Sequence, residues 1–248
     1  MTTEEGVVSK CPICGNSTNL SFMKDSYEIY KCSSCDFLFV SPYPSNNDII
    51  AYYNNNYRGI DINFYPKARS RQRRAFLKSF RFWRYLFRKH TIDVGCGGGF
   101  MTNAFRRLGA DAHGMDISEI SIVYARNRFP DCTFHCESFT SMAKNDLIFD
   151  FIFTTEVLEH IRGTREFMEM IVSISRPGTI IYLATPDAGH ESVPNDMSSW
   201  EDICPPAHIQ WFNQSNMALL FDNYGFKLVR TFTKKTPALS MLFQRMDE

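Results

Sequence analysis

Thr91-Ile92-Asp93-Val94-Gly95-Cys96-Gly97-Gly98-Gly99-Phe100 is an apolar run that breaks into glycines and then restarts as a predicted helix. Glycine adopts backbone angles that other residues avoid, and it lets a ligand approach the main chain closely. A helix that starts beyond the glycines offers N–H groups to polar or anionic ligand atoms. A tight strand-to-helix turn without a ligand is the alternative. The stretch therefore predicts a strand, a ligand-binding turn and a helix.

Strand-like and helix-like segments alternate from this loop towards the C-terminus. The pattern predicts helices over 101–108, 119–128 and 215–224, strands over 112–116, 133–136, 150–154 and 179–184, and a final hairpin over 226–233 and 239–244. Such alternation predicts a parallel sheet with helices on both faces and ligands at the carboxyl ends of its strands. Asp116 ends the second strand, and Glu137 and Ser138 follow the third.

The bulk composition fits one medium-sized α/β domain with a small appendage. The chain has 248 residues, 44% of them hydrophobic, which is enough for a core. Its formal net charge is zero, which argues against a surface that is basic all over. No stretch has the length of a membrane span, and the first residues lack the layout of a signal peptide. We therefore expect a cytoplasmic, reducing environment.

Two Cys-x-x-Cys pairs stand near the N-terminus, at Cys11 and Cys14 and at Cys32 and Cys35. Two such pairs at short separation bring four thiolates together, which is the ligand set of a closed structural zinc site. Gly15 and Asp36 follow the pairs and can take the left-handed turn that aims backbone N–H groups at sulfur. An ordinary set of buried cysteines is the weaker alternative. We predict a zinc ribbon over residues 1–42.

A linker and a basic segment separate the ribbon from the glycine loop. Residues 43–66 form the linker, and its Tyr- and Asn-rich part, 48–57, is expected to pack across the entrance of the next domain. Residues 67–90 contain ten Lys and Arg and no acid. Helical spacing predicts an inward-facing aromatic stripe of Phe76, Phe80, Trp83 and Phe87, with the arginines outward. Either the cations attract nucleic acid, lipid or acidic glycan, or, as we favour, the helix simply covers the sheet.

The segment from 67 to 248 resembles the class I S-adenosylmethionine-dependent methyltransferases. Asp93-Val94-Gly95-Cys96-Gly97-Gly98-Gly99 is similar to their first motif, and it differs from the dinucleotide pattern because the third glycine comes too early. The resemblance implies a Rossmann-like, seven-stranded methyltransferase sheet. It also implies cofactor contacts to the methionine part, the ribose and the adenine from Asp93, Gly95, Cys96, Gly97, Gly99, Asp116, Ile117, Glu137 and Ser138. The alternatives are a helix cap for Asp116 and a solvated loop acid for Glu137.

Glu156, Glu159 and His160 follow the fourth strand, where the acceptor should meet the methyl group. Their spacing predicts one face of a helical turn. Two carboxylates and an imidazole suit Mg²⁺, Mn²⁺ or a similar ion. The alternative is a turn that His160 merely braces. His208, beyond the 185–207 segment that is long enough for a substrate lid, can reach the same place.

This Glu-x-x-Glu-His turn with a later histidine is similar to two methyltransferase branches. These are the 3′-terminal 2′-O-methyltransferases of small RNAs and the O-methyltransferases of ubiquinone biosynthesis. The resemblance implies that Glu156, Glu159, His160 and His208 hold a divalent ion, and that Glu156, His160 and His208 are catalytic. His208 could instead act as general base.

Three functions remain open for the acceptor. The ribbon, the Tyr-rich linker and the Pro-Pro-x-His segment resemble bacterial methyltransferases of cell-surface sugar and secondary-metabolite pathways. A hydroxyl of a sugar or another small diol, free or in a glycan, is therefore the first choice. RNA, bound through residues 67–90, is the second, and neutral overall charge does not help it. The third is a non-catalytic S-adenosylmethionine-binding scaffold.

Overall fold

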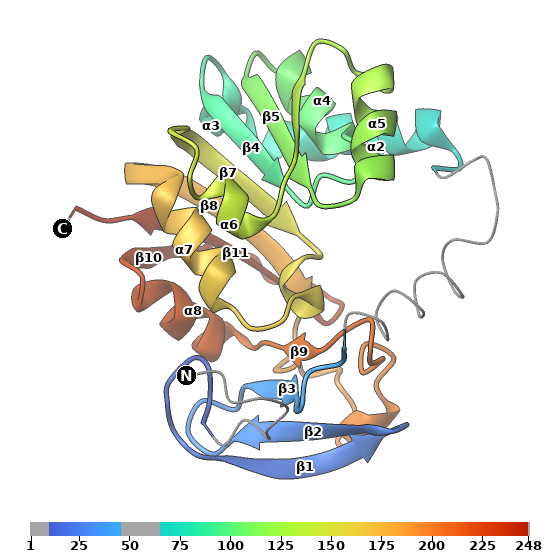
Figure 1. Ribbon diagram of the computed structural model, residues 1–248, viewed down its shortest axis with the longest axis vertical. Helices are drawn as coiled ribbons and strands as arrows, with labels where there is room; N and C mark the ends of the chain where they lie inside the picture. Colours follow the sequence, from blue (N-terminus) through green and yellow to red (C-terminus); the bar gives the residue numbers. More distant parts are fainter. Residues whose placement is uncertain (1–9, 46–64, 248) are drawn as a thin grey trace.

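The computed structural model describes residues 10–45 and 65–247, and a seven-stranded sheet forms its centre (Figure 1). The strand order is β10-β11-β8-β7-β4-β5-β6. Neighbouring strands from β8 to β6 are parallel, whereas β11 is antiparallel to both β8 and β10. The predicted α/β methyltransferase sheet is confirmed. Its strands are β4 His90–Val94, β5 Asp111–Asp116, β6 Thr133–Cys136, β7 Phe149–Thr155, β8 Ser175–Pro186, β10 Phe226–Thr231 and β11 Ala238–Arg245.

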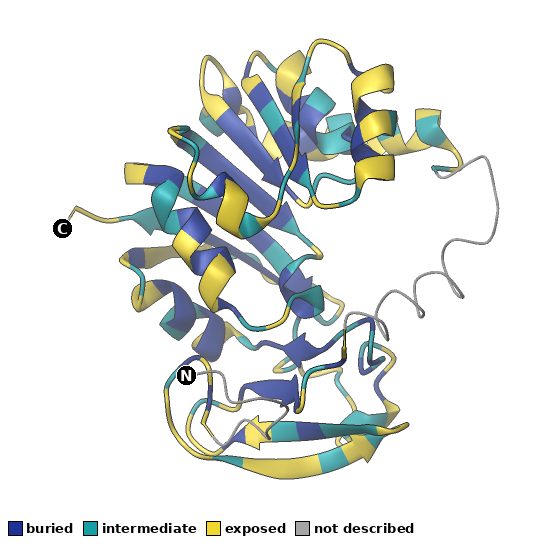
Figure 2. Cartoon of the chain, in the orientation of Figure 1, coloured by how far each residue is buried: buried dark blue, intermediate teal, exposed yellow. Residues whose placement is uncertain are grey.

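Helices cover both faces of this sheet. Its central strands, β4 and β7, are therefore buried on both sides (Figure 2). Phe151 and Phe153 of β7 pack on one face with Phe105 of α4, whereas Ile152 packs on the other with Phe167 of α7. The helices are α2 Ala68–Ser79, α3 Trp83–Leu86, α4 Phe100–Arg107, α5 Glu119–Arg128, α6 Phe139–Met142, α7 Arg165–Ser173 and α8 Gln214–Asp222, with short 3₁₀ turns η1 Phe80–Phe82, η2 Leu158–His160 and η3 Met197–Ser199. No described helix is long and apolar enough to cross a bilayer.

The basic segment is helical, but the predicted inward aromatic stripe is wrong. Phe80, Trp83 and Phe87 are exposed, and the side chains that face the sheet are Phe82 and Leu86. Phe82 lies between the rings of Phe151, Phe153 and Tyr182, with centroid distances of 5.5, 5.7 and 4.7 Å. The inward stripe is therefore displaced by one residue from the expected one. The arginines are exposed, as predicted.

A four-stranded antiparallel sheet, ordered β1-β2-β3-β9, lies at one end of the large sheet (Figure 1). Its strands are β1 Thr18–Lys24, β2 Tyr27–Cys32, β3 Leu38–Val40 and β9 Gln210–Trp211. The first three strands belong to the cysteine-rich region, whereas β9 comes from the segment that contains His208. The N-terminal region thus shares a sheet with the chain that follows β8.

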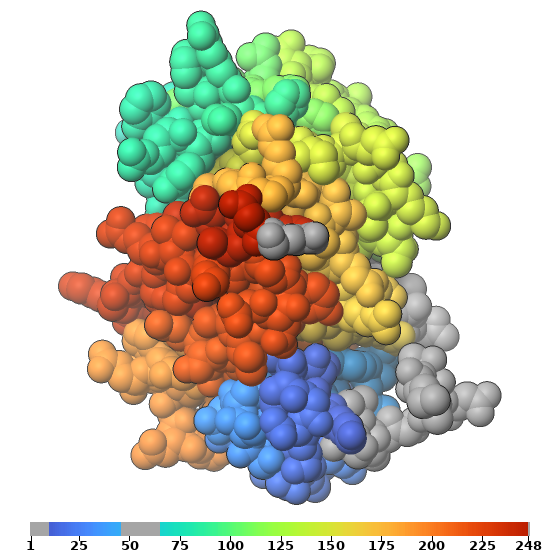
Figure 3. All heavy atoms as spheres, turned by 90° about the vertical axis from the view of Figure 1, so that its left-hand side faces the viewer, coloured from blue at the N-terminus to red at the C-terminus, as the bar shows by residue number. Residues whose placement is uncertain are grey.

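Side chains from the same two regions form a common core. Ile29 and Leu38 of the ribbon pack in one cluster with Trp200, Ile203 and Trp211. The ribbon also contacts α8, where Asn216 Nδ2 donates to the Cys35 carbonyl at 3.1 Å. In the space-filling view the blue N-terminal region lies directly against the orange and red C-terminal chain (Figure 3). The predicted packing of residues 48–57 lies outside the described residues.

Candidate functional site

The glycine loop joins β4 to α4 at the carboxyl edge of the sheet. Gly95, Gly97 and Gly99 have φ values of 76°, 51° and 74°, which disfavour residues with a Cβ. A Cβ on Gly95 would also lie 2.3 Å from Val157 Cγ2. The loop therefore contacts the turn that carries Glu159 and His160, so the predicted donor and acceptor regions adjoin each other.

Asp93 lies on β4 just before the loop and is almost fully buried. Thr102 Oγ1 donates to its Oδ2 at 3.0 Å. Burial raises the pKa of Asp93 from its ordinary value of 3.8 to about 7. Such a carboxyl group is poised to ionise when a cationic group enters the site.

Asp116 stands at the end of β5 and holds the loop in place. Its Oδ2 accepts from the Gly97 N–H at 2.9 Å, and its Oδ1 accepts from the Ser118 N–H at 2.8 Å. Each carboxylate oxygen has a second lone pair for a ligand hydroxyl. Ile117 is exposed beside it, and Cys96 is half-buried in the loop. Asp116 is not the cap of α5: the cap is Ser118, whose Oγ accepts from the Ser121 N–H.

Glu137 and Ser138 follow β6, the strand beside β5. Glu137 Oε2 accepts from Asn145 Nδ2 at 2.9 Å, and Ser138 Oγ accepts from the Ser141 N–H at 3.2 Å as the cap of α6. Both residues therefore stand at the predicted edge. Their contact with adenine stays a prediction.

Tyr65 is a residue of this region that the sequence did not single out. Its hydroxyl donates to Ser121 Oγ at 3.1 Å, and a Cβ on Gly98 would lie 2.7 Å from its ring. The ring thus covers the glycine loop. Only its position just before the basic segment could have drawn attention to it.

Glu159, His160 and His208 form a compact cluster beyond β7. One ligand atom of each residue lies within 4.8 Å of the other two. Glu159 is fully buried, and its Oε2 accepts from Thr185 Oγ1 at 2.8 Å. Its Oε1 has no hydrogen-bond partner among the described residues. A buried, unpartnered carboxylate oxygen beside two imidazoles fits a divalent cation.

Two backbone carbonyls orient the imidazoles. His160 Nδ1 donates to the Ala207 carbonyl at 2.7 Å, and His208 Nδ1 donates to the Asp202 carbonyl at 2.9 Å. Each ring then carries its lone pair on Nε2, the usual way to present a metal-binding histidine. Burial lowers the pKa of both rings, to about 4 for His208, so both are neutral near pH 7. His160 Nε2 lies 3.8 Å from Glu159 Oε1.

Glu156 does not join the compact group of ligand atoms. The predicted helical turn over 156–160 is wrong, because Glu156 has a left-handed φ of 56° and only Leu158–His160 form a 3₁₀ turn. Glu156 is exposed and lies outside the group. The Glu156 carboxyl group still interacts electrostatically with the cluster. Desolvation and then the negative charge of Glu159 raise the pKa of Glu156 to about 7. The structure thus brings together three of the four predicted ligands.

The four ribbon thiols form a second cluster with the size of a zinc cage. The Cys11 and Cys35 sulfurs are 3.6 Å apart, and those of Cys14 and Cys32 are 3.4 Å apart. A zinc–sulfur distance of about 2.3 Å gives a tetrahedron with edges of about 3.8 Å. Gly15 and Asp36 have the predicted left-handed conformation, with φ of 72° and 59°.

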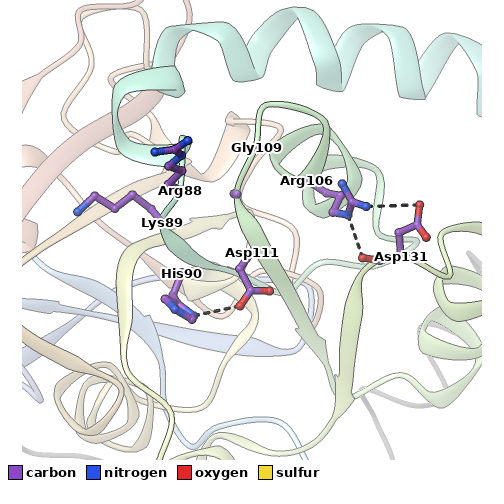
Figure 4. Close-up of a pocket in the computed structure, with 8 residues that line it drawn as sticks. Arg88, Lys89, His90, Arg106, Gly109, Asp111 and Asp131 are labelled. Atoms are coloured by element: carbon purple, nitrogen blue, oxygen red, sulfur yellow. Dashed lines mark hydrogen bonds and ion pairs between the residues drawn. The ribbon is translucent and has the colours of Figure 1, made fainter.

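A separate pocket of about 410 Å³ lies at the opposite edge of the sheet (Figure 4). It is lined by residues at the amino ends of β4 and β5, including His90 and Asp111. Ligands of parallel α/β sheets bind at the carboxyl edge. This pocket is therefore not part of the glycine-loop site.

Comparison with known proteins agrees with this geometry. A methyltransferase domain family matches residues 67–231. The ubiquinone biosynthesis O-methyltransferase of Coxiella burnetii is 31% identical over 101 residues, which are 39% of this chain and 43% of that protein. The protein of the same name from Parvibaculum lavamentivorans is 33% identical over 98 residues, which are 38% of this chain and 39% of that one. The matched part thus spans less than half of these curated relatives.

Solved structures show the same fold. Magnesium protoporphyrin IX methyltransferase from Synechocystis, solved with bound S-adenosylhomocysteine (SAH), has a TM-score of 0.56 at 18% identity, covering 81% of this chain and 100% of that one. An S-adenosylmethionine-dependent methyltransferase from Mesorhizobium loti has a TM-score of 0.55 at 16% identity, covering 69% and 98%. The chain belongs to the methyltransferase domain family and has the fold of the class I S-adenosylmethionine-dependent methyltransferases.

Proposed function

We propose that this protein transfers the methyl group of S-adenosylmethionine to a hydroxyl oxygen of a sugar or another small diol, with a divalent cation at Glu159, His160 and His208. The observation that carries the proposal is the buried, unpartnered Glu159 Oε1 beside two oriented imidazoles. In this transfer the sulfonium–carbon bond breaks and an oxygen–carbon bond forms. The hydroxyl proton passes to solvent water, and S-adenosylhomocysteine is the second product.

The methyl donor is proposed to bind along the carboxyl edge from β4 to β6. Asp93 and the glycine loop would hold its cationic methionine part, since the Asp93 carboxyl group can ionise near pH 7. Asp116 would accept from the ribose hydroxyls, and Glu137 from the adenine amino group. Tyr65 covers the loop and would exclude water from it.

The acceptor is proposed to bind at the Glu159 cluster. Glu159 Oε1, His160 Nε2 and His208 Nε2 would be the protein ligands of the cation. A bound divalent ion lowers the pKa of a coordinated hydroxyl group, which makes the oxygen a better nucleophile. His208 as general base is the weaker assignment, because its lowered pKa of about 4 makes its ring a poor proton acceptor.

The choice of a diol rests on the chemistry of three ligands. A divalent cation held by only three protein atoms would remain able to bind two neighbouring oxygens of one acceptor. The relatives named as ubiquinone biosynthesis O-methyltransferases support O-methylation as the reaction class. The relatives described above give no support to RNA as acceptor.

Methyl transfer to a matched pair of acceptors tests the proposal. A vicinal diol and its monohydroxy analogue are compared with Mg²⁺ or Mn²⁺ present and after chelation. We expect transfer to the diol and a loss of about 100-fold or more on chelation or in Glu159→Gln. The control Glu166→Gln, at an exposed position of α7, should keep near-parental activity. Mn²⁺ binding, followed by paramagnetic resonance, should weaken in Glu159→Gln.

Two results would contradict the proposal. Full activity after thorough removal of divalent ions would exclude the metal. S-adenosylmethionine binding without transfer to any hydroxyl, amine or thiol acceptor would favour the non-catalytic scaffold. A loss in Glu156→Gln as large as in Glu159→Gln would instead show that Glu156 contributes to the site.

A further inference from the structure

The surface of residues 67–89 combines exposed cations with exposed large apolar side chains. All ten Lys and Arg residues of this segment are exposed. Leu77, Phe80, Trp83 and Phe87 are exposed by 60, 49, 60 and 52%. The segment contains no acid. We call the surface made by these fourteen residues the basic aromatic face.

Leu77, Phe80 and Trp83 lie along a continuous helical segment, and Phe87 follows as the C-terminal cap of α3. Their spacing of three, three and four residues follows the turns of α2, η1 and α3. Arg73, Arg74 and Arg84 lie three or four residues from Leu77 or Phe80 and therefore flank the apolar row. In Figure 3 the teal part of the chain that includes this segment forms an outer corner of the molecule.

The positive charge of the face contrasts with the net negative charge of the rest of the chain. Because the formal net charge is zero, its ten cations are balanced by an excess of ten acids elsewhere. Lys234 lies close enough to this face for the charges of Arg81 and Lys78, after burial, to lower its pKa. Such an asymmetric charge orients the protein towards an anionic partner.

The pocket of Figure 4 lies at the end of this face. Arg88, Lys89 and Arg106 line it, and a Cβ on Gly109 at its wall would lie 2.9 Å from the Phe87 ring. Arg106 pairs with Asp131 at 3.7 Å. The pocket therefore offers exposed cations directly beside the apolar row.

We propose that the basic aromatic face binds the surface of an anionic lipid bilayer, with Leu77, Phe80, Trp83 and Phe87 inserted among the headgroups and the cations on lipid phosphates. Helices that lie in a membrane interface combine Lys and Arg with Trp, Phe and Leu in this way. This goes beyond the methyl-transfer chemistry and does not depend on it.

Charge and side-chain type favour a bilayer over two other partners. A second copy of this face would bring ten cations against ten cations, which repel. RNA binds exposed aromatic rings by stacking its bases on them, but Leu77, which is 60% exposed at the start of the apolar row, has no ring. Apolar insertion uses Leu77 and the rings alike.

Tryptophan fluorescence provides a direct test. The chain has three tryptophans, and Trp200 and Trp211 are buried, so a change in emission reports Trp83. We expect a blue shift and co-sedimentation with phosphatidylglycerol vesicles in low salt. Both should be weaker with phosphatidylcholine vesicles and in high salt.

Two double variants separate the charge from the apolar row. Arg73→Glu/Arg74→Glu should weaken binding by about 30-fold or more, since each cation near the surface contributes about fivefold. Leu77→Ser/Trp83→Ser should weaken co-sedimentation by about tenfold or more. All four side chains are exposed, so thermal unfolding should be unchanged.

Matched controls on other surfaces make the same chemical changes. Lys144→Glu/Lys227→Glu and Ile120→Ser/Val123→Ser alter exposed side chains outside residues 67–89 and should bind vesicles within about twofold of the parent. The proposal is overturned by equal binding to neutral vesicles, by full binding of either face variant, or by no binding to anionic vesicles. Tighter binding of single-stranded RNA than of vesicles, or self-association lost in Leu77→Ser/Trp83→Ser, would overturn it too.

Discussion

Replacement of the buried Asp93 by asparagine tests how strongly the site is prepared for a cation. The change keeps the shape of the side chain and an oxygen acceptor for Thr102, and it removes the charge. Burial raises the pKa of Asp93 by about three units, from 3.8 to about 7. Since one unit corresponds to about 1.36 kcal/mol, the ionised carboxylate costs the folded protein about 4 kcal/mol above pH 7.

The sign follows from proton linkage. Between pH 4 and 7 the folded state keeps the Asp93 proton while the unfolded chain has lost it, so the free energy of unfolding falls as pH rises. The asparagine side chain of the variant does not titrate. We therefore expect Asp93→Asn to gain stability relative to the parent, by roughly 2 to 3 kcal/mol more at pH 8 than at pH 5. Urea unfolding of both proteins at the two pH values measures this gap.

Asp150→Asn is a control with the opposite sign. Burial opposes ionisation there too, but Arg176 at 2.6 Å and the His90 N–H lower the pKa of Asp150 below its ordinary value. Its replacement should destabilise the protein at pH 8. The reasoning would be refuted if the difference in unfolding free energy between Asp93→Asn and the parent were the same at pH 5 and pH 8.

The same ionisation should control binding of the methyl donor. Because S-adenosylmethionine carries a sulfonium and an ammonium charge, it should bind the ionised form of Asp93 more tightly. Calorimetry should show an affinity for the parent that rises by up to about tenfold per pH unit below pH 7. The affinity of Asp93→Asn should be weaker and flat over this range.

Two further changes test the loop and the ribbon. Gly95→Ala should lose about 1–3 kcal/mol of unfolding free energy and bind S-adenosylmethionine more weakly, because Ala is strained at φ 76° and its Cβ would lie 2.3 Å from Val157. Gly178→Ala is the control, because Gly178 has a similar φ of 88° but open space around it. If Gly178→Ala lost as much unfolding free energy as Gly95→Ala, the Val157 contact would have no role. Cys11→Ser/Cys32→Ser should abolish zinc content, measured by mass spectrometry, and make the ribbon protease-sensitive; unchanged zinc would refute the cage.

The features that sequence predicted well depend on nearby residues. The glycine-rich turn follows from a strand, glycines and a helix in succession, and the cysteine cage follows from two close pairs. Both appear where expected, with left-handed Gly95 and Gly15. No local pattern predicts the strand Thr18–Lys24, because its apolar and polar residues do not alternate cleanly and it has little buried surface.

The basic segment shows why helical periodicity was not enough. Phe76, Phe80 and Trp83 recur with the same spacing as Ala75, Ser79 and Phe82, so both rows satisfy a helical period. The position of α3 is decided by Phe82, which fits between β7 and β8. That contact joins residues distant in sequence, and no local pattern contains it.

The Glu159 cluster could be predicted in composition but not in shape. The spacing of Glu156, Glu159 and His160 assumed an α-helical turn, whereas the left-handed backbone of Glu156 breaks that turn and leaves its carboxylate outside the compact group. His208 approaches because the chain after it pairs with the ribbon. The side-chain types in this stretch therefore predict which residues gather, whereas their arrangement depends on contacts between distant parts of the chain.

The ribbon and the Glu159 cluster are joined by backbone hydrogen bonds through Ile209. Its N–H donates to the Glu159 carbonyl at 2.8 Å, and its carbonyl accepts from the Val40 N–H at 2.9 Å. Val40 is the last residue of β3. It lies eight residues after Cys32, which belongs to the four-cysteine cluster. Loss of the cage should release β3 from β9 and free the residue before Ile209, which is His208. The proposed zinc site would thus be a condition for the geometry of a cluster that it does not touch.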